Sequence, residues 1–157
     1  MKRMFLIAAV GGMLFAALTT TAAADDAKDE AIKQDRQRIQ GTWQIIALEV
    51  DGNQASNEDI EKLTVVNGSD GTWSLRSEGK EVSKGTSEFD PTRQPKTIDF
   101  EPTDGDGKGE LYLGIYELGD KTRKLCFAPA GKDRPTEFVS KAGSEHILVM
   151  FARIEEK

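Results

Sequence analysis

Apolar side chains in this sequence gather in short segments separated by turn residues, and the pattern runs from residue 41 to the end of the chain. Segments rich in β-branched and aromatic residues, bounded by Gly, Pro, Asn and Asp, are typical of β-strands. Residues 57–62 resemble a single helical turn, with Ser56 or Asn57 as its cap. The pattern predicts eight strands, at residues 43–50, 63–66, 72–76, 80–89, 96–100, 110–118, 123–128 and 145–154.

Most connections between these strands are short. Residues 67–71 and 119–122 carry hairpin signals, because Asn and Gly tolerate positive φ. No helix of crossover length separates two strands, which excludes a parallel α/β sheet. An antiparallel sheet of about eight strands has two exposed edges unless it closes on itself. We therefore predict an all-β fold, an antiparallel eight-stranded up-and-down barrel, with an open sandwich as the alternative.

The first 24 residues have the pattern of a signal peptide. Lys2 and Arg3 precede an uncharged run, and its apolar part, residues 4–18, is short for a membrane span. Three alanines then precede Asp25. We expect cleavage before Asp25 and export to the periplasm or the medium, with no membrane attachment afterwards; an uncleaved anchor helix is the alternative.

Residues 25–40 are rich in charge, with acidic residues early and basic residues late, as the helix dipole favours. We predict that this segment forms a short N-terminal helix or linker and that it serves as a tether or as a lid on the barrel. The barrel domain itself is predicted over residues 41–157. Together these boundaries give one domain after a signal peptide and a short helical segment.

Charge narrows the classes of partner. The predicted signal removes two of the 21 basic residues and none of the 27 acidic ones, so the mature chain carries a net charge of −8. Nucleic-acid-binding proteins concentrate positive charge, and anionic membrane surfaces attract it. The balance therefore argues against both, and it favours solubility.

Residues that could carry catalysis are few. Cys126 is the one cysteine, so the chain forms no internal disulfide, and its apolar surroundings are typical of a small buried hydrophobe. A dyad with the one histidine, His146, competes with a strand-end imidazole that faces water. One Cys and one His do not complete a zinc site. Residues 104–107 resemble the start of a calcium loop, but Lys108 stands where a third oxygen ligand belongs. We therefore expect no enzyme activity, no cofactor and no metal.

The start of the first strand carries a family resemblance. Gly41-Thr42-Trp43, just after a short helix, resembles the G-x-W opening of the lipocalin and calycin barrels. In that group the tryptophan packs across the closed end of the barrel, beneath an arginine at the end of the last strand. The resemblance implies that Arg153 stacks on Trp43, a contact that contributes roughly 0.5–2 kcal/mol.

A second resemblance extends along nearly the whole mature chain. The chain is similar to a lipocalin-like domain family of unknown function that is abundant in planctomycete bacteria. This resemblance implies a fold and brings no catalytic or ligand residues. The motifs that carry it are Gln40-Gly41-Thr42-Trp43, Val50-Asp51-Gly52, Asp90-Pro91-Thr92, Pro95-Lys96-Thr97-Ile98-Asp99, Gly114-Ile115-Tyr116-Glu117-Leu118, Leu125-Cys126-Phe127-Ala128 and Arg134-Pro135-Thr136-Glu137-Phe138.

The predicted barrel makes a binding role the leading hypothesis, with a small apolar or amphipathic molecule as the ligand. Candidate lining residues are Trp73, Tyr116, Cys126 and Phe127, with Arg134 as a gate or an anion handle. The structural alternative is that the same side chains simply fill a solid core. The alternative function is a solid barrel that binds another exported protein, as an interaction module or an inhibitor.

Overall fold

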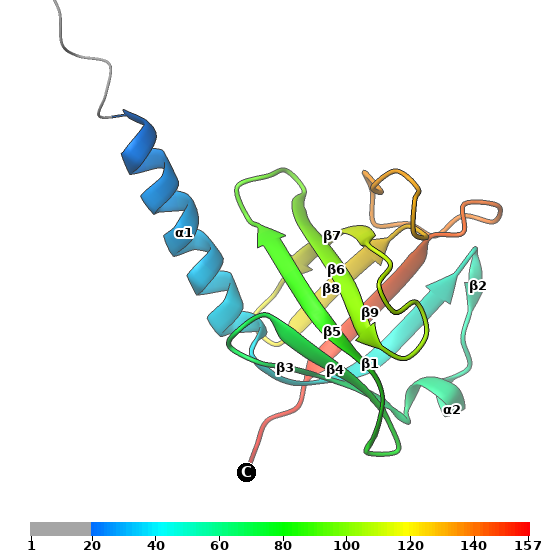
Figure 1. Ribbon diagram of the computed structural model, residues 1–157. Coiled ribbons are helices and arrows are strands. Elements are labelled where there is room, and N and C mark those ends of the chain that lie inside the picture. The colour runs from blue at the N-terminus through cyan, green and yellow to red at the C-terminus, as the bar shows by residue number, and fades with distance from the viewer. Residues whose placement is uncertain (1–19) are drawn as a thin grey trace, which may run out of the picture.

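The computed structural model describes residues 20–157, and the strands among them form one antiparallel sheet (Figure 1). The expected signal cleavage site lies within helix α1, and residues 1–19 of the expected signal lie outside the described residues. The elements are α1 (Thr20–Ile39), β1 (Gly41–Val50), β2 (Asn53–Gln54), α2 (Asn57–Ile60), β3 (Leu63–Asn67), β4 (Thr72–Ser77), β5 (Lys80–Asp90), β6 (Lys96–Asp104), β7 (Tyr112–Leu118), β8 (Thr122–Phe127) and β9 (Ile147–Arg153).

The sheet closes on itself. From β3 to β9 each strand pairs antiparallel with the next, β1 pairs with β3, and β9 returns to pair with β1 over seven residue pairs. This confirms the predicted eight-stranded up-and-down barrel and excludes the open sandwich. The short strand β2, which the sequence pattern did not predict, adds two pairs to the end of β1.

Each of the eight predicted strands is present within a few residues of its expected bounds. The largest difference is β6, which continues to Asp104 through Pro102. Proline cannot donate to a ladder, so it is tolerated at bulges. Pro102 pairs with Gly85, and the register shifts between Lys84 and Gly85, which accommodates the missing donor.

Helix α2 is the single turn that the sequence predicts. Ser56 is its cap: the Ser56 Oγ accepts a hydrogen bond from the Asp59 backbone N–H at 3.2 Å and donates one to the Asp59 carboxylate at 2.6 Å. Ile60, at the end of the turn, is buried in the main core. Helix α2 therefore packs against the barrel wall between β1 and β3.

Helix α1 covers one end of the barrel with its C-terminal half. Residues 21–30 are exposed, and Figure 1 shows the N-terminal half of the helix projecting away from the strands. The ion pair from Lys28 to Asp90, at 3.1 Å, ties it to the end of β5. Asp35 and Ile39 are 5% and 3% exposed, so the last turns of α1 seal the end of the barrel. We call this the closed end. Within residues 20–157, no helix combines the length and the apolar character needed to span a membrane.

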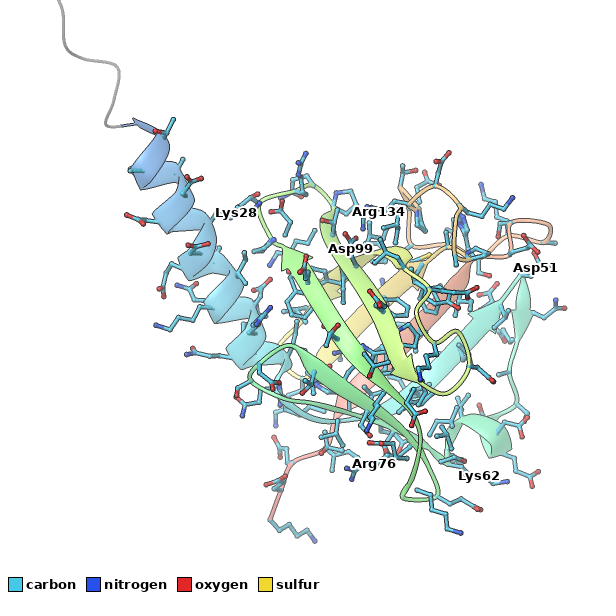
Figure 2. The ribbon with its side chains drawn as sticks, viewed as in Figure 1. Lys28, Asp51, Lys62, Arg76, Asp99 and Arg134 are labelled. Atoms are coloured by element: carbon cyan, nitrogen blue, oxygen red, sulfur yellow. The ribbon has the colours of Figure 1, made fainter. Side chains whose placement is uncertain are left out.

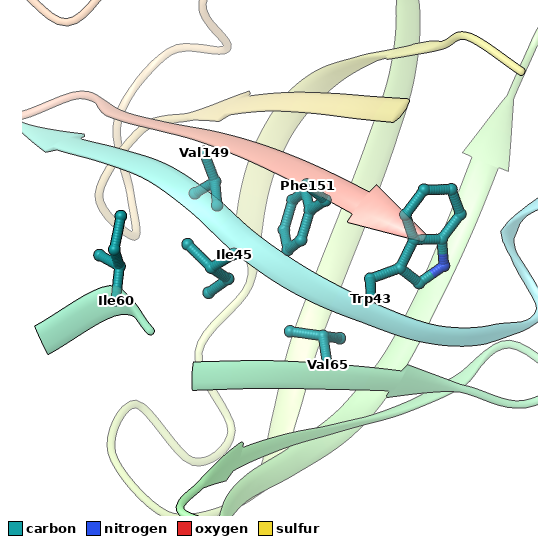
Figure 3. Close-up of a cluster of buried hydrophobic side chains, with 6 residues drawn as sticks. All are labelled: Trp43, Ile45, Ile60, Val65, Val149 and Phe151. Carbon is teal, nitrogen blue, oxygen red and sulfur yellow. The ribbon is translucent and has the colours of Figure 1, made fainter. Parts of the chain in front are cut away.

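The buried core falls into two clusters along the barrel. The smaller one lies under α1 and consists of Ile39, Phe89, Ile98 and Tyr116. The larger one lies between β1, β3 and β9 and is shown in Figure 3, and its members are Trp43, Ile45, Ile60, Val65, Val149 and Phe151.

Candidate functional site

The barrel encloses a cavity of about 510 Å³, which is within the range of small-molecule sites. All eight barrel strands contribute side chains to its wall, and most of these side chains are apolar. Val50 and Val82 line the cavity and are 41% and 50% exposed, so the cavity reaches the surface at the end opposite α1. We call this the open end.

Aromatic rings form one side of the wall. Phe100 lies at their centre: its ring stacks on Tyr112 at 5.1 Å and meets Phe127 edge-on at 4.8 Å and Trp73 edge-on at 6.1 Å, measured between ring centroids. Trp73 and Phe127, two of the residues that the sequence predicted, thus line the cavity together. Gly85 makes room for the indole, because a Cβ there would lie 2.6 Å from Trp73 Cζ2.

Tyr116 lies outside the cavity, in the core cluster under α1. Its hydroxyl donates a hydrogen bond to Asp35 Oδ2 at 2.8 Å, and Lys96 Nζ reaches the same oxygen at 2.8 Å. Burial, with this hydrogen bond and the charge of Asp35, raises the pKa of Tyr116. Tyr116 shares a face of β7 with Tyr112, but it lies farther along the strand, where α1 covers the barrel. It therefore belongs to the seal of the closed end.

Cys126 lies on the outward face of β8, beneath the segment that follows the strand. Its thiol is fully buried and hydrogen bonds to the Val139 carbonyl at 3.5 Å, rather than to His146. Burial raises the pKa of the Cys126 thiol, and the hydrogen bond to Val139 opposes the shift. The thiol is therefore held protonated in a small apolar site, and it does not line the cavity.

Arg134 also lies outside the cavity and joins β6 to β7 (Figure 2). Its Nη1 donates hydrogen bonds to the backbone carbonyls of Ile98, at 3.1 Å, and Gly114, at 2.7 Å. Its Nη2 forms an ion pair with Asp99 Oδ1 at 2.6 Å. Because its nitrogens meet two carbonyls and a carboxylate, Arg134 is a bridge between strands in this structure.

The expected stack of Arg153 on Trp43 is present. The Arg153 guanidinium carbon lies 4.4 Å from the centre of the indole ring, and the two residues are paired across β1 and β9. Arg153 Nη1 donates to the Gln40 carbonyl at 2.7 Å, and Nη2 donates to the Arg38 carbonyl. The indole Nε1 donates to the Ile39 carbonyl at 2.7 Å. The stack thus ties the last turn of α1 to the closed end of the barrel.

A second arginine, Arg123, lies against the same tryptophan and was not among the predicted residues. Its guanidinium carbon is 4.2 Å from the centre of the Phe151 ring and 5.3 Å from that of Trp43. Unlike Arg153, it lines the cavity, and it is 8% exposed. Strand alternation was the available signal, because Arg123, Leu125 and Phe127 occupy one face of β8 and Phe127 was expected inside.

Within residues 20–157, no group of three or more His, Cys, Asp or Glu side chains is close enough together to hold a metal ion. The Asp104 carboxylate accepts a hydrogen bond from the Gly105 N–H at 3.0 Å, which is turn geometry.

Comparison of the chain with known protein families, with curated proteins and with solved structures finds no match in any of the three. The resemblance to the planctomycete lipocalin-like family therefore stays a prediction.

Proposed function

We propose that this protein is an exported lipocalin-like barrel that binds one small apolar or amphipathic molecule in its interior, without catalysis. The cavity of about 510 Å³ is the observation that carries the proposal. Protein interiors are normally packed to the density of organic crystals, with few voids larger than a water molecule. An eight-stranded barrel is small enough for side chains to fill it or for one small ligand to fit. A wall drawn from all eight strands, largely apolar and open at one end, favours the ligand.

The other hypothesis is a solid-core module that binds or inhibits another exported protein. That hypothesis requires an interior filled by side chains. A barrel with a cavity of this size favours the binding hypothesis over it.

Titration with a neutral apolar fluorophore, N-phenyl-1-naphthylamine, tests the proposal. We expect a saturable rise and blue shift in its emission with one site per chain. Leu75→Trp adds side-chain volume to the cavity wall from β4 and should weaken binding at least tenfold. Met150→Trp is the matched control, because Met150 is 38% exposed and lies on the outer face of β9, so its binding should equal that of the wild type.

Circular dichroism of both variants checks that the barrel is folded. Non-saturable binding by the wild type, or equal binding by Leu75→Trp and the wild type, would contradict the proposal. In either case the fluorophore would be reporting general surface hydrophobicity.

A further inference from the structure

Arg123 places a cation deep in the cavity. It follows the turn at residues 119–121, and the carbonyls of Leu118 and Gly119 at that turn accept hydrogen bonds from Arg38 of α1. Arg123 therefore lies at the closed end, far from the exposed rim at Val50 and Val82. Phe151 and Trp43 contact its guanidinium through their ring faces, which hold it in position without using its N–H donors.

In the described part of the chain, the Arg123 guanidinium forms no hydrogen bond or ion pair with another protein group, and its Nε is buried without any partner. The Nε of Arg36 is likewise buried without a partner, but Arg153 and Arg134 differ. Arg153 donates to two backbone carbonyls, and Arg134 meets two carbonyls and the Asp99 carboxylate. A second donor in the same cavity, Asn67 Nδ2, is also buried without a partner. Donors, rather than acceptors, are thus left over at this site.

The charge of Arg123 is also uncompensated. Burial, and then repulsion from Arg153, lowers the pKa of Arg123 to about 9. That value still lies above neutral pH, so the side chain carries its positive charge there. No carboxylate contributes to this shift. A buried cation without a counter-charge is unfavourable, and an anion that entered the cavity would remove the penalty.

We propose that Arg123 binds the anionic head of the ligand, and that the ligand class is an amphipathic carboxylate, which enters the cavity head first and leaves its apolar body against the aromatic wall. A planar guanidinium matches a carboxylate with two parallel hydrogen bonds. The apolar wall between Arg123 and the open end accounts for the rest of the molecule. This inference rests on the proposed function and specifies its ligand.

The test compares two probes with the same alkyl chain, decanoate and decan-1-ol, in displacement of N-phenyl-1-naphthylamine. Hydrogen bonds to charged groups are strong enough that the wild type should bind decanoate about tenfold or more tightly than decan-1-ol. Arg123→Met should abolish this preference, so that decanoate and decan-1-ol bind to the variant with equal affinity. Lys124→Met, which removes a cation from the outer face of the same strand, should keep the preference.

Equal affinity of the wild type for the two probes would overturn the inference, and this comparison needs no variant. A preference for decanoate that survives in Arg123→Met would overturn it as well. If the neutral fluorophore binds while decanoate shows no preference, the proposed function stands and the assignment of Arg123 fails. If no probe binds, the proposed function itself fails.

Discussion

Two arginines contact Trp43, and replacing each by methionine should change the free energy of unfolding in opposite directions. Both guanidinium groups lie on aromatic rings, so each substitution loses a cation–π contact of roughly 0.5–2 kcal/mol. The difference between the two sites lies in their hydrogen bonds. Arg153 donates to two backbone carbonyls, whereas the Arg123 Nε has no partner.

For Arg153→Met, the loss includes the hydrogen bonds to Gln40 and Arg38, which join α1 to the barrel. Hydrogen bonds to charged groups contribute about 1.5–3 kcal/mol when buried, and this side chain is half-buried. We therefore expect a decrease of about 2–3 kcal/mol in the free energy of unfolding.

For Arg123→Met, the lost cation–π contacts are opposed by removal of a buried, unpaired charge. Replacing buried charges by apolar groups of similar volume is neutral or stabilises by about 1–4 kcal/mol. The expected net result is an increase of about 1 kcal/mol in the protein freed of ligand. The stabilised variant is also the one that should lose the preference for decanoate.

Urea unfolding followed by far-UV circular dichroism measures both variants, on protein stripped of ligand on a hydrophobic resin. The denaturant slope should match that of the wild type, since the surface exposed on unfolding is nearly the same. A loss of 2 kcal/mol or more in Arg123→Met, comparable to Arg153→Met, would refute the reasoning. Arg123 would then stabilise the closed end through its aromatic contacts.

Further predictions concern three other residues of the barrel. Tyr116→Phe should lower the free energy of unfolding at neutral pH by about 1.5–3 kcal/mol, because Asp35 loses a buried donor, as urea unfolding can measure. Since its pKa is raised from 10.0, folding keeps Tyr116 protonated, so the wild type should lose stability relative to this variant as the pH rises above 10. The Cys126 thiol should react with Ellman's reagent only after unfolding; fast reaction of the native protein would contradict its burial. Gly85→Ala should destabilise the barrel by about 1–3 kcal/mol in the same unfolding assay, because the added Cβ meets the backbone carbonyl of Glu101 and the Trp73 indole. An unchanged unfolding midpoint would contradict both close contacts.

Much of the barrel can be predicted from the sequence, because the residues that indicate strands and turns are neighbours in the chain. Turn residues separate the strands, so bounds such as those of β3 and β4 follow from the pattern within one residue. The Ser56 cap could also be predicted, from helix-capping preferences, and the Arg153–Trp43 stack could be predicted from the G-x-W resemblance. Antiparallel pairing followed from the lack of crossover helices, and closure followed from the two edges that an open sheet would expose.

The residues of the candidate site could be predicted only in part from the sequence. Cys126 and Phe127 were both expected to line the interior, but consecutive residues of a strand point to opposite faces, so at most one of them does. That rule also places Arg123 on the same face as Phe127, and applying it strictly along β8 would have found the buried arginine. Trp73 was placed correctly in the cavity wall by its aromatic character and strand position.

By itself, then, the sequence determined the eight barrel strands, most of their turns and the alternation of side chains between the two faces of each strand, because these depend on neighbours in the chain. Only the tertiary structure decided the height of a residue along the barrel axis. Tyr112 and Tyr116 share a face of β7, yet one lines the cavity and the other packs under α1. The tertiary structure also decided which arginines find partners. Residue type alone does not distinguish Arg134 from Arg123. The folded backbone brings carbonyls and a carboxylate to Arg134, whereas Arg123 faces only aromatic rings and the cavity.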